Sequence, residues 1–290
     1  MRLDQINIRD PFIYSEKGTY YLYGTRGAEA FVGKASGLDV YVSKDLQEFE
    51  GPFTVFERYE GFFSDRFYWA PEVYRYRDRY YMFATFTYDG KKEGTASLIA
   101  DSPMGPFKLL SDKTLTPENW RCLDGTLYIS KKGEPYMVFA REWREIKDGT
   151  IYRMKLNEDL SAAVEEPVAL FAASEGKPLV RSFFFGRYVT DGPFLFRTKD
   201  DVLHMIWSSY GKKGYNQLLA HSDNNEIDGN WTIDRQPLFE NDGGHGMVFE
   251  DGYGKMKLVL HYPNKSKKEH PILIDIGYEN NRLIKIGGSK

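Results

Sequence analysis

Short apolar runs recur along the whole chain, and polar turns separate them. Runs such as TYYLYGT and RYYMFATF are rich in aromatic residues, as strands are, and Gly, Pro, Asn or Asp residues bound them. No segment sustains the i, i+3, i+4, i+7 spacing of an amphipathic helix through a dozen residues. The pattern therefore predicts an all-β protein built from many short strands.

The same pattern of residues occurs five times. Each copy opens with a small or ionisable residue and then Pro or Gly, followed by an apolar strand, a polar turn and a second, more aromatic strand. The openings lie 60, 54, 67 and 54 residues apart. The five copies are DPFIYSEKGTYYLYGT from Asp10, APEVYRYRDRYYMFAT from Ala70, DGTLYISKKGEPYMVFA from Asp124, DGPFLFRTKDDVLHMIWSS from Asp191 and HGMVFEDGYGKMKLVLH from His245.

Each unit has room for two further strands after this hairpin. LDVYVSK and then DLQEFEGPF follow in the first unit, and NQLLAHSD and then DGNWTID follow in the fourth. Five units of four antiparallel strands predict a five-bladed β-propeller. We expect one domain over residues 1–290, closed by packing of blade on blade without exchange of a strand between the chain ends. The predicted blades cover approximately residues 8–60, 68–112, 122–172, 188–236 and 243–287.

Composition limits the classes of binding partner and the cellular location that we expect. Aromatic residues make up 16% of the chain, the formal net charge is −3 and the charges are interspersed, so no basic stripe for nucleic acid is present. No stretch approaches the ~18 apolar residues of a membrane span, so we expect no membrane partner. The single cysteine, Cys122, is expected to be a small buried residue. A cytoplasmic location is expected, although removal of a secretion signal would leave a similar sequence.

The opening residues of the five repeats are candidates for a catalytic site. The innermost strand of each propeller blade begins beside the axis, so Asp10, Ala70, Asp124, Asp191 and His245 should converge there. A single Asp in such a place often only caps a turn. Three carboxylates and an imidazole gathered from four units are typical of a functional site, because clustered like charges raise each other's pKa and reduce stability.

The ordered motifs RDPFIY, YWAPEVY, LDGTLY, TDGPFLF and GGHGMVF resemble glycoside hydrolase family 43 over essentially the whole chain. The resemblance implies a five-bladed propeller and inverting hydrolysis, with α-L-arabinofuranosidase, β-xylosidase and arabinanase as common activities. It also implies an oligosaccharide partner and no required cofactor. A structural Ca²⁺ on the axis, or an ion or water near His245, is compatible with the family, but no catalytic metal is expected.

Two catalytic carboxylates follow from the resemblance. Asp10 resembles the family's general base, and Asp124 resembles the carboxylate that orients the general acid and modulates its pKa. The motif TDGPFLF differs from the family's pattern. The family's general acid is usually a Glu before Gly-Pro, and this chain has Asp191 there. Glu142, in the run AREW after the second strand of blade three, is the other candidate for the acid. As an isolated residue it would instead be an ion-pair partner of Arg141 or Arg144.

Other residues are expected to bind the sugar. Trp69 could stack on a sugar ring, although the alternative is a core aromatic between blades, and Ala70 would leave the axis open. The complete set of predicted binding residues is Trp69, Ala70, Arg141, Trp143 and His245, with Phe31, Phe185, Arg9 and Arg187 as weaker candidates. His204, His221, His261 and His270 are expected to be structural.

These expectations combine into one function. The chain is predicted to be an inverting hydrolase that releases terminal pentose units, α-L-arabinofuranosyl or β-xylosyl, from oligosaccharides. Inversion requires the base and acid carboxyls to lie ~6.5–9.5 Å apart. A β-galactofuranosidase on the same scaffold and an inactive sugar-binding propeller are the alternatives.

Overall fold

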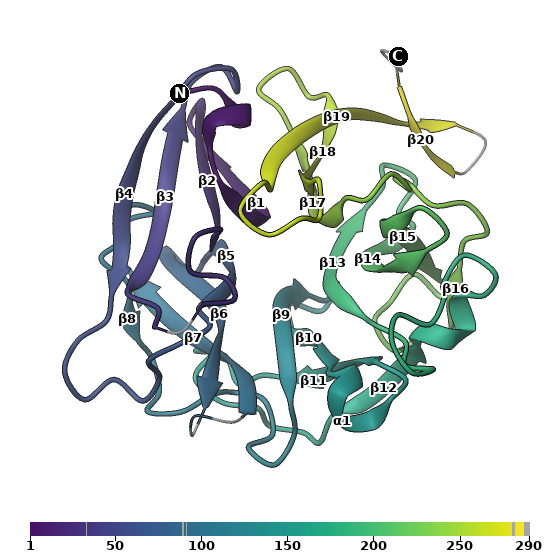
Figure 1. Cartoon of the computed structure of the whole chain (residues 1–290), viewed down its shortest axis with the longest axis horizontal. Helices are drawn as coiled ribbons and strands as arrows, with labels where there is room; N and C mark the ends of the chain where they lie inside the picture. The colour runs from purple at the N-terminus through teal and green to yellow at the C-terminus, as the bar shows by residue number, and fades with distance from the viewer. Residues whose placement is uncertain (33, 89, 91, 280–281, 287–290) are drawn as a thin grey trace.

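Five four-stranded antiparallel sheets surround a central axis in the computed structural model (Figure 1). The structure describes residues 1–32, 34–88, 90, 92–279 and 282–286. Residue 287, the end of the last predicted blade, lies outside the described residues. The five sheets confirm the predicted five-bladed propeller with four strands per blade.

The first three blades follow one another along the chain. Blade one contains β1 (Ile8–Glu16), β2 (Thr19–Arg26), β3 (Gly37–Ser43) and β4 (Phe49–Glu57). Blade two contains β5 (Trp69–Tyr76), β6 (Arg79–Tyr88), β7 (Lys92–Ala100) and β8 (Lys108–Leu109). Blade three contains β9 (Cys122–Ile129), β10 (Pro135–Arg141), β11 (Thr150–Lys155) and β12 (Val168–Ala172).

The last two blades complete the ring. Blade four contains β13 (Asp191–Arg197), β14 (Leu203–Gly211), β15 (Gly214–Ser222) and β16 (Trp231–Ile233). Blade five contains β17 (Gly244–Glu250), β18 (Met256–Tyr262), β19 (His270–Glu279) and β20 (Arg282–Lys285). Blade five draws all its strands from the C-terminal part of the chain, so no strand is exchanged, as predicted.

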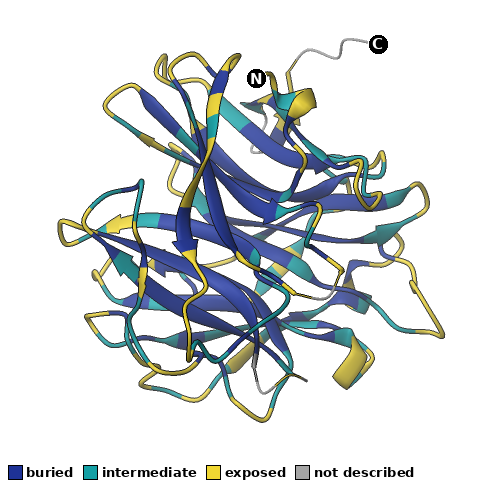
Figure 2. Cartoon of the chain, turned by 60° about the vertical axis from the view of Figure 1, so that its left-hand side comes forward, coloured by how far each residue is buried: buried dark blue, intermediate teal, exposed yellow. Residues whose placement is uncertain are grey.

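Blades pack through apolar faces and leave polar residues on the rim. Most strand interiors are buried, and exposed residues are concentrated in the turns (Figure 2). Phe12 of β1 illustrates the packing, because its ring meets Tyr74 of β5 at 5.2 Å and Phe194 of β13 at 6.0 Å, both edge to face. Burial of such rings removes large apolar areas from water and stabilises the ring of blades.

Helical segments are short among the described residues. They are the 3₁₀ segments η1 (Leu3–Gln5) and η2 (Ala173–Gly176) and the α-helix α1 (Trp143–Ile146). None of the helices in the described part of the chain is long and apolar enough to cross a membrane. The short α1 was not predicted from sequence, and it begins directly after Glu142.

Candidate active site

A β-bulge interrupts the innermost strand of every blade beside the axis. The first residue of each bulge has left-handed backbone geometry, which a non-glycine residue adopts at a cost of roughly 1–3 kcal/mol. The five residues are Asp10 (φ 53°), Ala70 (φ 45°), Asp124 (φ 58°), Gly192 (φ 52°) and His245 (φ 48°). Strain at the equivalent position of four blades, all but the one with Gly192, indicates that the ring of bulges positions these side chains for a function.

Side chains from the preceding blade hold the bulges in place. At the equivalent position of the second strand, a hydroxyl or imidazole accepts a hydrogen bond from the bulge amide of the next blade. Four blades do this: Thr25 for Ala70 (2.8 Å), Thr85 for Asp124 (2.9 Å), Ser208 for His245 (2.8 Å) and His261 for Asp10 (3.2 Å). The His261 contact joins blade five to blade one and closes the ring.

Blade three departs from this rule. Ala140 occupies the equivalent position opposite Leu123 and has no hydrogen-bonding side chain. The amide of Gly192 donates instead to Oδ2 of Asp124, at 3.0 Å. This bond fixes the orientation of the Asp124 carboxylate.

The predicted place of Asp191 was wrong by one residue. Gly192, not Asp191, occupies the left-handed position shared by Asp10 and Asp124. The reason is that the Pro or Gly after the left-handed residue marks the bulge, and in TDGPFLF this residue is Pro193. Asp191 therefore corresponds to Arg9 and Trp69, whose side chains line the pocket around the axis.

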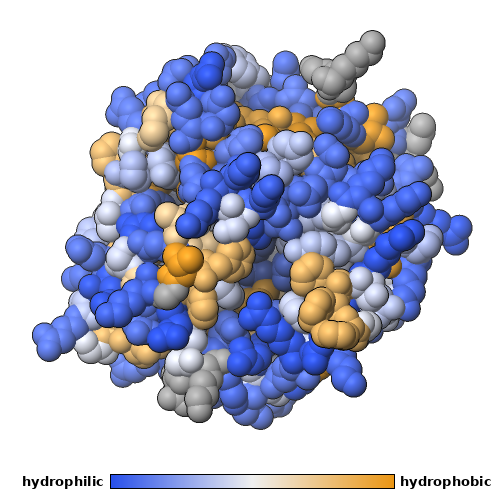
Figure 3. Space-filling model, in the orientation of Figure 1, coloured by the Kyte–Doolittle hydropathy of each residue, from blue (hydrophilic) through white to orange (hydrophobic). Residues whose placement is uncertain are grey.

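The axial pocket gathers residues from all five blades and the loops beside them. It contains all four predicted catalytic candidates. The lining residues are Arg9, Asp10, Phe31, Trp69, Leu123, Asp124, Glu142, Trp143, Arg144, Phe183, Val189, Asp191, Tyr210 and His245. The space-filling view shows a hollow near the centre of this face with apolar surface on both sides (Figure 3).

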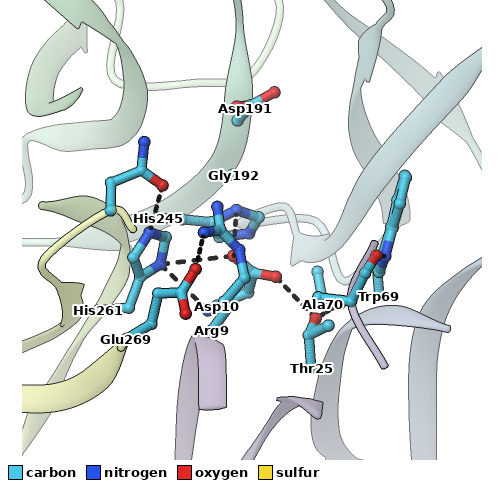
Figure 4. A network of polar contacts seen from close by, with 12 residues as sticks. Arg9, Asp10, Thr25, Trp69, Ala70, Asp191, Gly192, His245, His261 and Glu269 are labelled. Atoms are coloured by element: carbon cyan, nitrogen blue, oxygen red, sulfur yellow. Dashed lines mark hydrogen bonds and ion pairs between the residues drawn. The ribbon is translucent and has the colours of Figure 1, made fainter. Parts of the chain in front are cut away.

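Asp10 is held as a carboxylate. Its Oδ2 accepts a hydrogen bond from Thr25 (2.7 Å), and its Oδ1 lies 3.1 Å from Nδ1 of His245. Burial raises the pKa of Asp10, but His245 and Arg9 outweigh that effect and lower it below its ordinary value. Figure 4 shows Asp10, His245 and His261 in one cluster, with Asp191 set apart from them.

Asp124 and His245 share a charge environment with Asp10. Nδ1 of His245 also lies 3.8 Å from Oδ2 of Asp124. Burial lowers the pKa of His245, but the carboxylates of Asp10 and Asp124 outweigh burial, so the pKa lies above its ordinary value. Burial raises the pKa of Asp124, His245 opposes the rise, and the nearby Asp191 and Asp10 add to it. The cluster therefore favours an anionic Asp10 beside a cationic His245.

Asp191 and Glu142 are the two candidates for a proton donor. Asp191 accepts a hydrogen bond from the Tyr215 hydroxyl (2.9 Å), and burial raises its pKa. Glu142 is 4% exposed and accepts a hydrogen bond from the amide of Arg144 (3.2 Å), so it caps α1. Burial raises the pKa of Glu142 to about 7, the Arg144 guanidinium opposes the rise, and Asp191 adds to it.

Aromatic side chains form two walls of the pocket. On one side, Trp69 packs against Phe67 (4.9 Å) and Phe31 (6.3 Å), and its Nε1 donates to the carbonyl of Ala30 (2.7 Å). On the other side, Phe183 lies edge to face with Trp143 at 5.8 Å and stacks on Tyr210 at 4.1 Å. These walls present flat apolar surfaces to the pocket.

Several predicted binding residues do not line the pocket. Arg141 lies over the Trp120 ring (3.9 Å) and pairs with Glu145 (3.0 Å), and it is not among the residues that line the pocket. Ala70 is 2% exposed, so its side chain is buried beneath the site. Arg187 donates to the carbonyls of Trp143 and Arg144, and Phe185 projects into solvent from the loop that carries Phe183.

Two residues near the site had not been expected to contribute to it. Nδ1 of His261 accepts a hydrogen bond from the Asp10 amide. Burial lowers the pKa of His261 to about 3, which keeps this imidazole neutral. Glu72 is buried beside Asp124 and His245 and accepts a short hydrogen bond from Tyr74, and burial raises its pKa to about 8. The APE in YWAPEVY was the available signal for Glu72, since it places a carboxyl two residues after the bulge position.

The axial residues do not form a direct calcium site. Within the described part of the chain, no three His, Cys, Asp or Glu side chains are arranged to hold a metal ion. Calcium takes six to eight oxygen ligands, whereas Asp10 and Asp124 are committed to His245, Thr25 and the Gly192 amide.

Thr25→Val is expected to lower kcat about 10-fold and to leave KM within about twofold. Valine has the same shape but removes the hydrogen bond to Asp10 and leaves the Ala70 amide without its acceptor. Loss of that donor raises the pKa of Asp10, so the acidic limb of the pH–rate profile should move to higher pH. Thr25→Ser keeps the hydroxyl and should restore both properties. An unchanged pH profile in Thr25→Val would show that Thr25 does not position Asp10.

Comparisons with known proteins agree with this geometry. The sequence model of the family described as Glycosyl hydrolases family 43 matches residues 5–282. A solved structure described as an endo-arabinase from Bacteroides thetaiotaomicron VPI-5482 is 39% identical, with 97% of this chain and 98% of that chain covered and a TM-score of 0.88. No curated protein matches the sequence.

Two more distant solved structures share the fold. A thermostable family-43 glycoside hydrolase is 21% identical with a TM-score of 0.83, and 98% of this chain and 94% of that chain are covered. An α-L-arabinofuranosidase from Lactobacillus brevis is 17% identical with a TM-score of 0.78, and the coverage is 97% and 94%.

Proposed function

Because the chain belongs to glycosyl hydrolase family 43, we propose that it hydrolyses α-L-arabinofuranosyl linkages in oligosaccharides with inversion at the anomeric carbon. One observation carries the chemistry: the carboxyls that line one pocket have pKa values shifted in opposite directions. Asp10 is shifted down, whereas Glu142 is shifted up to about 7. Environments that push the pKa values of two carboxyls apart suit a base and an acid that act in one step.

In the proposed mechanism, Asp10 is the general base. Its carboxylate takes a proton from a water molecule, which attacks the anomeric carbon, and the bond to the departing oxygen breaks in the same step. Glu142 delivers its proton to that oxygen. Asp124, whose carboxylate is held by the Gly192 amide, orients the reacting groups. Asp191, which raises the pKa of Glu142, accepts hydrogen bonds from sugar hydroxyls.

The choice of arabinofuranose rests on similarity. The 39%-identical structure is described as an endo-arabinase, whereas the other relatives support only the fold. Release of terminal units and cleavage within a chain are both compatible with the two aromatic walls. β-Xylosyl substrates remain the second choice.

The substrate assignment can be tested on a panel of polymers and aryl glycosides. We expect reducing sugar from linear arabinan and nitrophenol from the aryl α-L-arabinofuranoside, and much slower release from aryl β-xyloside and aryl β-galactofuranoside. The length distribution of the early arabinan products distinguishes terminal release from internal cleavage. Faster hydrolysis of a xyloside or galactofuranoside would contradict the arabinofuranosyl assignment, and binding without hydrolysis of any sugar would indicate an inactive sugar-binding propeller.

The pH dependence of kcat/KM follows from the same two carboxyls. Asp10 must be ionised, and its lowered pKa places the acidic limb below its ordinary value of 3.8. Glu142 must be protonated, so the rate should fall as the pH rises through about 7. Arg144→Met removes a positive charge that lowers the pKa of Glu142, so the alkaline limb should move to higher pH.

Arg77→Met is the matched control for this shift. Arg77 is an exposed arginine that pairs with Glu158 on the rim at 3.0 Å. Its loss should leave the profile unchanged. An alkaline limb that stays in place in Arg144→Met would contradict the assignment of that limb to Glu142.

A further inference from the structure

The loop that carries Phe183 ends in an exposed pair of phenylalanines. Phe184 is 57% exposed and Phe185 is 87% exposed, and their rings lie edge to face at 4.3 Å. Phe183, the residue before them, lines the pocket and stacks on Tyr210. The exposed rings thus continue a wall of the site outward into solvent.

This tip has a defined conformation. The amide of Arg187 donates to the carbonyl of Phe184 (3.0 Å), with Phe185 at φ 49° and Gly186 at φ 72°. Positive φ at both central residues is the geometry of a type I′ turn, in which Asn-Gly is strongly preferred. The chain has Phe-Gly instead, so a bulky aromatic residue occupies a strained position in contact with water. Folding alone gives no reason for that choice.

The turn is also fixed to the catalytic part of the protein. The guanidinium of Arg187 donates to the carbonyls of Trp143 and Arg144, both at 2.9 Å. The amide of Tyr188 donates to the carbonyl of Lys147 (2.8 Å). These bonds fasten the C-terminal side of the turn to α1, the helix that Glu142 caps, and to Lys147 at the end of this helix. The exposed rings therefore keep a set position relative to Glu142.

We propose that Phe184 and Phe185 form a distal stacking site for a sugar unit of the same oligosaccharide, beyond the units held in the axial pocket. The inference rests on the proposed function, and it adds that the enzyme prefers longer chains. Continuity with the Phe183 wall identifies the occupant as an extension of the substrate. A neutral pentose has apolar C–H faces that match flat rings without any charged partner.

Phe185→Asn tests this site without damage to the turn. Asn-Gly is the favoured pair for a type I′ turn, so the variant should unfold at the same temperature or higher. We expect kcat/KM on arabino-oligosaccharides of five or more units to fall about 3- to 10-fold, mainly through KM. The value on the aryl α-L-arabinofuranoside should stay within about twofold.

Tyr253→Asn is the matched control. Tyr253 is 90% exposed in the turn between β17 and β18 and does not line the pocket. Its loss should not change the dependence on chain length.

The outcomes separate the two proposals. Wild-type enzyme that cleaves no arabino-oligosaccharide would overturn the proposed function. Active wild type whose preference for chain length survives in Phe185→Asn would overturn the stacking site alone. A wild-type dimer in sedimentation that dissociates in Phe185→Asn would also overturn it, because the rings would then bind a second copy of the chain.

Discussion

Asp10→Asn is expected to lower kcat/KM by roughly 10²- to 10⁴-fold, the contribution of a positioned general base. The amide cannot take the proton from the attacking water. The substitution suits the fold, because asparagine tolerates the left-handed geometry found at Asp10 (φ 53°) better than most residues. Loss of activity would therefore report chemistry and not misfolding.

The measurement is steady-state hydrolysis of the aryl α-L-arabinofuranoside, with thermal unfolding of both proteins as the control. KM should stay within a few-fold, since Asp10 acts on water and not on the leaving group. A folded variant that keeps more than about a tenth of the wild-type rate would show that another residue is the base.

Glu142→Gln is expected to discriminate between leaving groups. Hydrolysis of arabino-oligosaccharides should fall roughly 10²- to 10⁴-fold, because an alkoxide cannot leave without a proton. An aryl glycoside with a dinitrophenol leaving group needs no such proton, so its rate should stay within about 10-fold of wild type. The alkaline limb near pH 7 should also disappear, because Glu142 causes it in this account.

Asp191→Asn is the matching variant of Asp191, the other candidate for the proton donor. Asp191 is proposed to bind sugar hydroxyls, so both classes of substrate should be affected alike, with an increase in KM. If Asp191→Asn retained the dinitrophenyl substrate and lost the oligosaccharides, while Glu142→Gln lost both, the roles of the two residues would have to be exchanged.

Sequence repetition was enough to predict the propeller and the convergence of Asp10, Asp124 and His245. The reason is physical: the apolar strands, polar turns and bulge residues recur in every blade, and a closed ring places equivalent residues at the same distance from the axis. RDP, LDG and GHG all place their functional residue at the left-handed position.

Other features depended on contacts that no local pattern contains. Asp191 was misplaced because TDGP has two residues able to open the repeat, and only the backbone geometry shows that Gly192 is the left-handed one. The exception at Ala140, where Asp124 replaces a missing hydroxyl, involves residues of two blades. Arg141, the last residue of β10, faces Trp120, whereas Glu142 lines the pocket as the cap of α1, a helix that was not predicted.

The most direct test of the central claim is the anomeric configuration of the first product. Proton NMR spectra recorded during the first moments of hydrolysis of an α-L-arabinofuranoside distinguish the two anomers before they interconvert. Inversion by the Asp10 and Glu142 pair predicts that β-L-arabinofuranose appears first and the α anomer later. Initial release of the α anomer would contradict the account, because retention requires a carboxylate that attacks the sugar itself.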